Sequence, residues 1–401
     1  MATTPEQCAH ATPEDDLTRP PFFTDGGQAM HAWLDRMRQE RPVLLDSTSQ
    51  VWRVLRYDDA TQVLGDWRTF SNDMSRLTLS EELVEGNIAV LDPPRHQVLR
   101  ALVSQAFTPR RLAALEAGIA ERAARVLDAG REGGRMEFVR DLAYPLPLSV
   151  IADLLGLPSA DRPVLERCAD AQIRITAPDP SDTGLQQRRE QAMAELLDLL
   201  RDQVKRKRST PGEDLMSTLG TAEADGRRLT DEEIVTFSVL LLMAGHVTTM
   251  GLLSNLAVCM DEHPDAYAAV RADPSLIPGA VEETLRFRPP VPDAARVTAT
   301  DVTLHGVDIP RNRLVLVATV SAARDERRFP HPGRFDITRS PNPHLAFSHG
   351  PHFCLGAQLA RLEARIVLRL LTERWTRIRV AEREWQPSHA LTAPQRLVLA
   401  V

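Results

Sequence analysis

The stretch Phe347-Ser-His-Gly350-Pro-His-Phe-Cys354-Leu-Gly356 stands directly before a run from Ala357 to Trp375 with leucine and isoleucine at helical spacing. Cys354 therefore lies at the start of a predicted helix. There the helix dipole and the free backbone N–H groups favour a thiolate, the form of cysteine that binds metals. Gly350 permits a tight turn ahead of the cysteine, and Gly356 removes a side chain where a flat ligand could approach the helix.

Three interpretations of this cysteine compete at the level of residue types. A lone cysteine is most often a small, inert, buried hydrophobe. A zinc site could draw on four donors within eleven positions, namely His344, His349, His352 and Cys354. Their spacing matches no common structural zinc pattern. The third interpretation, a thiolate ligand to haem iron, depends on motifs elsewhere in the chain.

The composition is that of an ordinary soluble globular protein. Of 401 residues, 43% are hydrophobic and 26% charged, and 55 acidic against 48 basic side chains give a net charge of −7. Acidic residues are interspersed throughout, so nucleic-acid binding is not expected. The four cysteines lie far apart without a Cys-x-x-Cys pair, which argues against a disulfide framework.

Nothing in the sequence indicates a membrane protein. The most apolar stretch, around Val235 to Gly245, is about half of the ~20 residues that a bilayer span needs. The segment from Met1 to Arg19 has no basic region followed by an apolar core, so it does not resemble a secretory signal. We therefore expect a cytoplasmic protein.

The chain is predicted to be mainly helical with small β-sheets. Thr108 and Pro109 begin a helix that Gly130 is expected to end. A capping box at Thr230–Glu233 begins a second, of about 30 residues or roughly 45 Å, which should cross the core. Short strands are expected within 51–57 and 302–320, and the loop 178–181 is either a lid or a plain connector.

The spacing Phe347-x-x-Gly350-x-x-x-Cys354-x-Gly356 resembles the haem-binding signature of the cytochrome P450 family. The resemblance implies the family fold, with haem between a long central helix and the cysteine-bearing helix. It implies haem b as cofactor and Cys354 as the axial ligand of the iron. It also implies one domain over residues 1–401, with a short flexible segment at about 1–20.

A second family motif is Glu283-Thr-Leu-Arg286, followed by Arg334-Phe335. Alone, an acid and a base at i, i+3 on a helix are commonplace. The resemblance implies that Glu283, Arg286 and Arg334 form a buried charge network that supports the cysteine loop.

A third motif places His96 and Arg100 one helical turn apart, so that both point the same way. Two cations on one face suit a carboxylate ligand, although a solvated helix face gives the same pattern. Arg296 and His352 fall where the family has further partners. The resemblance implies that these four side chains hold the haem propionates.

The centre of the long helix, Ala244-Gly245-x-x-Thr248, resembles the family's oxygen-binding groove. A threonine within a helix ordinarily bonds back to the carbonyl four residues earlier, here Ala244. In the functional interpretation Gly245 leaves room for dioxygen and the Thr248 hydroxyl donates to it. The family commonly has an acid where this chain has Val247, so protons must come from Thr248 with water or substrate, or from Thr249 and His246.

The reaction implied is monooxygenation, in which one oxygen atom of O2 enters the substrate and the other leaves as water. No glycine fingerprint of a nucleotide-binding domain is present, so ferredoxin and ferredoxin reductase are the expected electron donors. Basic residues on the cysteine side could dock an acidic partner, namely Arg110, Arg111, Arg361 and Arg365.

The substrate pocket is expected to be mostly apolar, which suits a bulky ligand. By resemblance it is lined by residues within 72–90, 170–185 and 290–295, and includes Met243, Val247, Val291, Ala294 and Leu391. Tailoring of a polyketide, macrolide or peptide, free or on a carrier protein, is the expected role, and a monomer the expected state. Alternatives are an atypical oxidation, a haem-binding sensor or carrier, and a zinc-stabilised helical binding protein.

Overall fold

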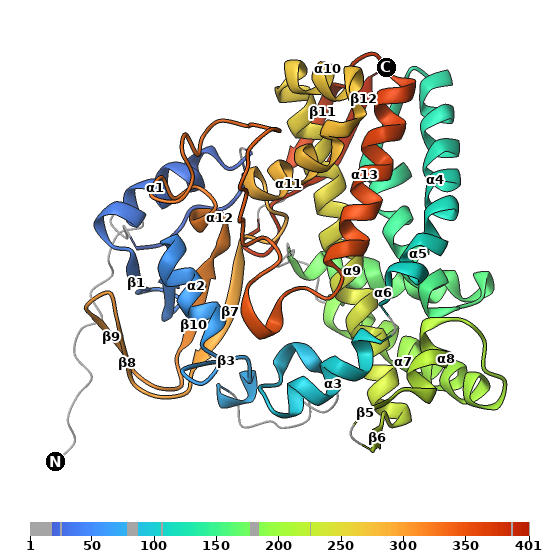
Figure 1. Ribbon diagram of the computed structural model, residues 1–401, viewed down its shortest axis with the longest axis horizontal. Coiled ribbons are helices and arrows are strands. Elements are labelled where there is room, and N and C mark those ends of the chain that lie inside the picture. Colours follow the sequence, from blue (N-terminus) through green and yellow to red (C-terminus); the bar gives the residue numbers. More distant parts are fainter. Residues whose placement is uncertain are drawn as a thin grey trace.

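The computed structural model describes residues 18–24, 26–77, 87–105, 107–176, 184–224, 226–385 and 388–400. Most of the expected terminal segment at about 1–20 lies outside these residues, as does the whole of the loop 178–181. Helices predominate in the described part and the strands form small sheets, which confirms the predicted fold class (Figure 1).

Most of the helices gather on one side of the molecule, with α9 and α13 side by side, while α1, α2 and α12 lie with the largest sheet on the other side (Figure 1). The α-helices of the described residues are α1 (Gln28–Glu40), α2 (Tyr57–Gly65), α3 (Arg95–Ser104), α4 (Pro109–Glu132), α5 (Pro145–Leu155), α6 (Arg162–Thr176), α7 (Leu185–Ser209), α8 (Leu215–Thr221), α9 (Asp231–Glu262), α10 (Pro264–Ala272), α11 (Ile277–Phe287), α12 (Thr319–Ala322) and α13 (Ala357–Arg374). A π-helical segment, η3 (Val139–Ala143), leads into α5, and a short 3-10 turn, η6 (Gly350–His352), precedes Cys354.

The largest sheet has the strand order β1-β2-β10-β7-β3, in which β10 runs parallel to β2 and the other pairs are antiparallel. A three-stranded sheet has the order β11-β12-β4, and β5-β6 and β8-β9 form hairpins. The strands are β1 (Val43–Asp46), β2 (Val51–Val54), β3 (Phe70–Ser71), β4 (Arg135–Glu137), β5 (Glu223–Ala224), β6 (Arg227–Arg228), β7 (Asp293–Thr298), β8 (Val302–Leu304), β9 (Val307–Ile309), β10 (Leu314–Ala318), β11 (Arg379–Trp385) and β12 (Pro394–Ala400).

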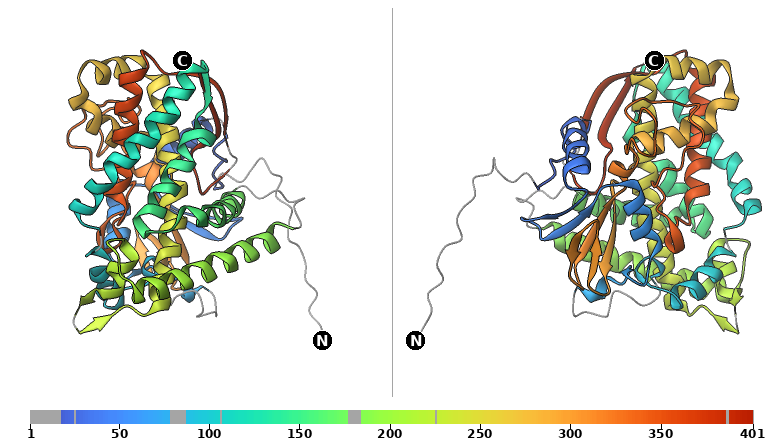
Figure 2. Two further views of the ribbon diagram at one scale, coloured as in Figure 1. Left: turned by 90° about the vertical axis from the view of Figure 1, so that its right-hand side faces the viewer. Right: turned by 60° about the vertical axis from the view of Figure 1, so that its left-hand side comes forward.

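The long helix α9 begins as its sequence predicts. Glu233 donates its backbone N–H to Thr230 Oγ1 at 3.1 Å, and the Glu233 carboxylate accepts the Thr230 N–H at 3.0 Å. The helix continues for 32 residues and ends just before Pro264. It is the one helix in the described part that is long and apolar enough to span a membrane. It packs against α5, α7 and α13 in the core, so its apolarity has a structural reason (Figure 2).

The predicted end of α4 is wrong by three residues. Thr108 accepts the Arg111 N–H as expected, but the helix runs through Glu132 and Gly133 caps it. Gly130 lies inside the helix, where a Cβ atom would stand 2.9 Å from Met136 Sδ. Gly130 therefore allows β4 to pack closely on α4 and does not end the helix.

Candidate active site

The cysteine loop is a tight turn that contains η6 and leads into α13. The Cys354 N–H donates to the Phe347 carbonyl at 2.9 Å, and Ser348 and Gly350 both have positive φ. A Cβ atom on Gly350 would lie 3.0 Å from both the Gly65 Cα and the Leu64 carbonyl oxygen of α2. Glycine is required there by conformation and by space, and the loop is held in place against α2.

Cys354 is exposed, whereas Cys168 and Cys259 are buried. Burial raises the pKa of the thiol above its ordinary value. Hydrogen bonds from the backbone N–H groups of Gly356 and Ala357, together with the charges of Arg100 and Arg361, offset only part of this effect. The sulfur thus meets the start of α13 as predicted, with two N–H donors aimed at it. Because Cys354 is exposed, it is not the inert buried cysteine that residue type alone suggests.

Four nitrogen-bearing side chains converge beside the loop from α3, β7 and η6. The rings of His96 and His352 lie 4.1 Å apart, and Arg100 donates to the Phe353 carbonyl at 2.8 Å. Burial, followed by the positive charges of His96, Arg296 and Arg100, lowers the pKa of His352 to about 3.

These side chains leave several buried nitrogens without a partner among the described residues. They are both ring nitrogens of His96, His352 Nε2 and one terminal nitrogen of Arg296. Unpaired buried donors are costly. A set of guanidinium and imidazole groups with unused donors fits a carboxylate-bearing ligand, so the donor chemistry matches the two propionates of haem.

The predicted groove lies at the middle of α9. The Thr248 hydroxyl donates to the Ala244 carbonyl at 2.6 Å, the ordinary back-bond of a helical threonine. Ala244 is exposed while the following turns of α9 are buried, so this turn faces open space. Val247 is buried in the core, and a Cβ atom on Gly245 would lie 2.8 Å from Ile151 Cδ1. Gly245 therefore leaves room for the Ile151 side chain where α5 packs on α9.

The side chain of His246 does not lie with Thr248. Its Nε2 atom is 2.9 Å from the carbonyl oxygen of Tyr144, the residue before α5. Since that contact fixes the ring on the α5 side of α9, the suggestion that His246 delivers protons in the groove is wrong.

Glu283 and Arg286 form the buried pair that the sequence predicts. Both side chains are fully buried, and the guanidinium binds the carboxylate through two contacts of 2.7 and 2.8 Å. The other Arg286 N–H groups donate to the carbonyl oxygens of Ala323, Pro332 and Arg334. The pair thereby ties α11 to the segments that lead to the cysteine loop.

The assignment of the Arg334 side chain to this network is wrong. Arg334 is exposed and contributes only its carbonyl oxygen. The second guanidinium comes from Arg339, whose Nε lies 3.3 Å from Glu283, and the carboxylate also accepts from Asn342 at 3.1 Å and from the Asp336 N–H at 2.8 Å. No spacing signal marks Arg339, because it reaches Glu283 through an irregular segment.

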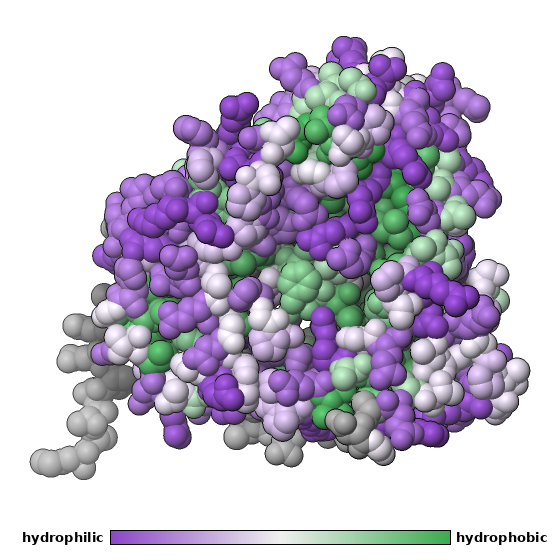
Figure 3. All heavy atoms as spheres, in the orientation of Figure 1, coloured by the Kyte–Doolittle hydropathy of each residue, from purple (hydrophilic) through white to green (hydrophobic). Residues whose placement is uncertain are grey.

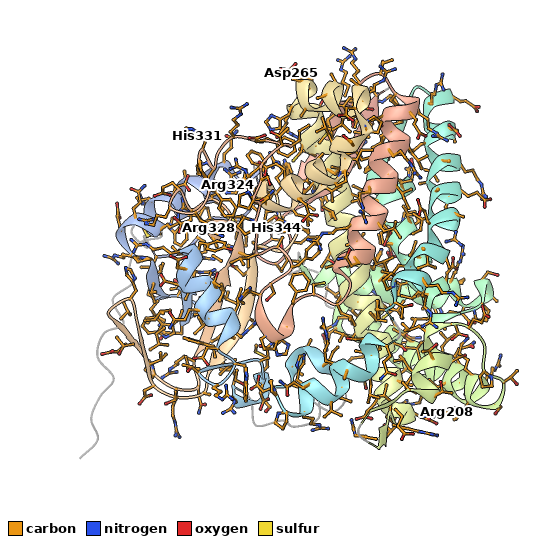
Figure 4. All side chains as sticks on the ribbon, in the orientation of Figure 1. Arg208, Asp265, Arg324, Arg328, His331 and His344 are labelled. Atoms are coloured by element: carbon orange, nitrogen blue, oxygen red, sulfur yellow. The ribbon has the colours of Figure 1, made fainter. Side chains whose placement is uncertain are left out.

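A second ion-pair cluster, absent from the sequence analysis, lies between α11 and α13. Glu282 accepts two hydrogen bonds from Arg361 at 2.7 and 2.8 Å and one contact from His344 at 3.1 Å. Burial opposes ionisation, yet these partners lower the pKa of Glu282 to about 2. Figure 4 shows His344 between the sheet and α13.

This cluster bears on two earlier interpretations. Among the described residues no group of three or more histidine, cysteine, aspartate or glutamate side chains could hold a metal ion, and His344 is paired with Glu282. The zinc interpretation is therefore wrong.

The same contacts limit which of the predicted docking arginines are available to a partner. Arg361 is largely committed to Glu282, and Arg111 donates to Thr218 and to the Glu213 carbonyl. Arg110 and Arg365 are therefore the more available docking residues.

The proposed pocket residues come from α9 itself and from two segments that adjoin it. A Cβ atom on Gly251 would lie 2.8 Å from Pro290 Cβ and 3.4 Å from Leu391 Cδ1, so both segments pack directly on the helix. Met243, Val291 and Ala294 are half-buried, whereas Val247 and Leu391 are buried. Residues 78–86 and 177–183 of the expected lining lie outside the described residues. Hydrophobic side chains gather near the middle of the face in Figure 3.

Comparison with known proteins identifies the fold and the class. The family model "Cytochrome P450" matches residues 179–388, which include α9, Glu283, Arg286 and Cys354. The chain is 44% identical over 367 residues to cyclomarin C epoxidase of Salinispora arenicola, covering 90% of this chain and 93% of that protein. It is 41% identical over 355 residues to erythromycin C-12 hydroxylase of Saccharopolyspora erythraea, covering 88% of each.

A ligand-free structure of cytochrome P450 TbtJ1 superimposes with a TM-score of 0.88 at 44% identity, covering 95% of this chain and 99% of that chain. The chain belongs to the cytochrome P450 family. It is a monooxygenase whose cofactor is a haem iron.

Proposed function

We propose that this enzyme inserts one oxygen atom from O2 into a bulky natural product, by hydroxylation or epoxidation, in secondary metabolism. The observation that carries the proposal is the exposed Cys354 beside two arginines and two histidines, three of which have buried nitrogens without a partner among the described residues. That arrangement supplies both an axial sulfur and a carboxylate site. Haem b, which carries two propionates and no covalent link to the chain, is the form proposed.

In this proposal Cys354 is the iron ligand, and the propionates are held by His96, Arg100, Arg296 and His352. Haem bound through a thiolate supplies oxygen activation, which consumes two electrons and two protons. The Phe347 ring, at the start of the cysteine loop, is buried, and the Arg361 guanidinium lies 4.5 Å from its centroid. Thr248 holds a proton at Oγ1, and turning this hydroxyl away from the Ala244 carbonyl presents that proton to the open side of α9.

Val247 leaves Thr248 without a neighbouring acid. A buried valine cannot relay protons, so we expect Val247→Asp to raise the fraction of consumed electrons recovered in product. Val247→Asn is the matched control, because it has the same shape and a polar end but does not ionise. The measurement is product formed per electron consumed. Equal values for the aspartate variant and the wild type would show that Val247 does not limit proton delivery.

The names of the relatives guide the choice of substrate. They specify epoxidation of cyclomarin C and hydroxylation at C-12 of erythromycin. We propose a macrolide-, polyketide- or peptide-type substrate, free or carried on a protein. Turnover of such compounds under isotopically heavy O2 tests this, since one heavy atom should appear in the product. Intact haem binding with no labelled product from any of them would favour a haem-binding sensor or carrier.

We propose ferredoxin and ferredoxin reductase as electron donors, with an acidic surface docking near Arg110 and Arg365. Exchanging both arginines for glutamate should slow reduction by ferredoxin by about tenfold at low salt and much less at high salt, because opposite charges steer association. Stopped-flow reduction at several ionic strengths measures this, with Arg311→Glu, at an exposed arginine in the turn between β9 and β10, as control. Rates insensitive to ionic strength would contradict the docking site.

The remaining features of the proposal concern the state of the enzyme. We propose that residues 1–401 form one catalytic domain and that the enzyme works as a cytoplasmic monomer. Light scattering on the purified holoenzyme would check the monomer, and a stable dimer would overturn it.

A further inference from the structure

The turn of α9 that carries Ala244 and Thr248 packs against the start of α5. Gly245 accommodates the Ile151 side chain, and His246 Nε2 lies 2.9 Å from the Tyr144 carbonyl oxygen. The rings of His246 and Tyr144 also meet edge to face, with centroids 4.5 Å apart at 86°. These contacts fall within the same turn as Ala244 and Thr248.

The His246 ring has one protonation state in this setting. A carbonyl oxygen can only accept, so His246 donates from Nε2, which leaves Nδ1 as a bare acceptor. Nδ1 is buried and has no partner among the described residues, and burial lowers the pKa of the ring to about 4. The imidazole is therefore neutral, and its one hydrogen bond tethers α9 to Tyr144.

Tyr144 connects this tether to a third helix. Its hydroxyl donates to the Asp170 carboxylate of α6 and lies 3.4 Å from the Glu166 carbonyl. Its backbone N–H donates to the Val139 carbonyl at 2.8 Å and closes the π-helical segment η3. Such segments are rare and often lie at functional sites. Tyr144 thus joins α5, α6 and α9.

We propose that His246 is a positioning residue, which sets how deeply and at what rotation the turn with Ala244 and Thr248 faces the haem. Positions two residues apart on an α-helix point about 200° apart, so a tether on His246 acts directly opposite Thr248. Because Tyr144 also contacts Asp170, a shift of α6 would move Tyr144 and, through the His246 hydrogen bond, the same turn of α9. This inference rests on the proposed function, because it assigns His246 to that reaction.

Two substitutions of His246 distinguish the effect of its hydrogen bond to Tyr144 from the effect of the volume of its ring. His246→Phe keeps a ring against Tyr144 but cannot donate, whereas His246→Gln can donate from its amide to the Tyr144 carbonyl. Ser254→Ala is the matched control, since it removes another buried hydrogen bond of α9, from Ser254 to the Met250 carbonyl at 2.8 Å, away from Tyr144.

The test uses the holoenzymes. The infrared C–O stretching band of the reduced carbon monoxide complex reports contacts of the groove with a bound diatomic ligand, and hydrogen peroxide released per electron reports uncoupling. We expect His246→Phe to shift and broaden the band and to cut productive coupling by about tenfold, as small misplacements around a reacting centre do. His246→Gln should retain the wild-type band, and Tyr144→Phe should broaden it less than His246→Phe does.

A His246→Phe enzyme with the wild-type band and coupling, and with a loss of thermal stability equal to that of Ser254→Ala, would overturn the inference by showing a merely structural histidine. The proposed function is judged separately on the wild type. If that protein lacks the red-shifted Soret band of a thiolate–carbon monoxide complex, the proposed function fails and this inference with it.

Discussion

Arg286→Leu should destabilise the folded protein by about 3–5 kcal/mol, because it leaves the Glu283 carboxylate buried without its main counter-charge. Both side chains are fully buried, and Arg286 makes five hydrogen bonds counted over its three guanidinium nitrogens. Arg286→Lys should recover little, since an ammonium group cannot reproduce the paired contact. The measurement is the free energy of unfolding in urea, together with the haem retained per chain.

Two further arginines, both in the segment between α12 and η6, test which side chains stabilise this buried network. The Arg339 side chain is buried against Glu283, so Arg339→Leu should lower the free energy of unfolding by nearly as much as Arg286→Leu. The Arg334 side chain is exposed, so Arg334→Leu should change the free energy of unfolding by less than about 0.5 kcal/mol. A large loss at Arg334 with none at Arg339 would contradict the network. Wild-type stability in Arg286→Leu would show that the pair is dispensable.

Glu363→Gln should stabilise the protein at neutral pH. Glu363 lies in α13, is fully buried, and its Oε2 atom has no hydrogen-bond partner among the described residues. Burial raises the pKa of this carboxyl from 4.5 to about 8. Between those values the folded state binds more protons than the unfolded state, so the stability due to this group is complete below pH 4.5 and is lost as pH rises toward 8.

At pH 7 the Glu363 carboxyl is protonated in the folded state, whereas in the unfolded state it is ionised, which stabilises the unfolded state. At 1.36 kcal/mol per pH unit, this corresponds to a cost of about 3 kcal/mol, which glutamine does not incur. Urea unfolding of both proteins from pH 5 to pH 8 should give curves that diverge as pH rises. The exposed Glu373→Gln of the same helix is the control. Parallel curves for Glu363→Gln and wild type would contradict the raised pKa.

Features of the fold set by local chemistry could be predicted from the sequence. The capping box at Thr230–Glu233 begins α9, the apolar run carries it to Pro264, and Gly350 marks the turn before Cys354 because no larger residue fits there. The end of α4 was not predictable in this way, because Gly130 meets Met136 of a strand that sequence alone does not bring near.

The candidate site shows the same division. The Glu283–Arg286 pair is encoded by spacing on one helix, but its third member is not, because Arg339 reaches Glu283 through an irregular segment. The Glu282 cluster joins α11 to residues more than sixty positions later, and the Tyr144 contact of His246 spans 102 positions. Neither pairing leaves a periodic signal. Helical spacing alone places His246 and Thr248 on opposite sides of α9, but only the three-dimensional arrangement shows that His246 contacts Tyr144.

The most direct test of the central claim is the absorption spectrum of the reduced protein with carbon monoxide, taken for the wild type and for Cys354→Ser. A strongly red-shifted Soret band in the wild type, absent from a serine variant that still folds, is the predicted result and would establish Cys354 as the thiolate ligand of a haem iron. The same band in both proteins, or haem bound without it in the wild type, would contradict this assignment.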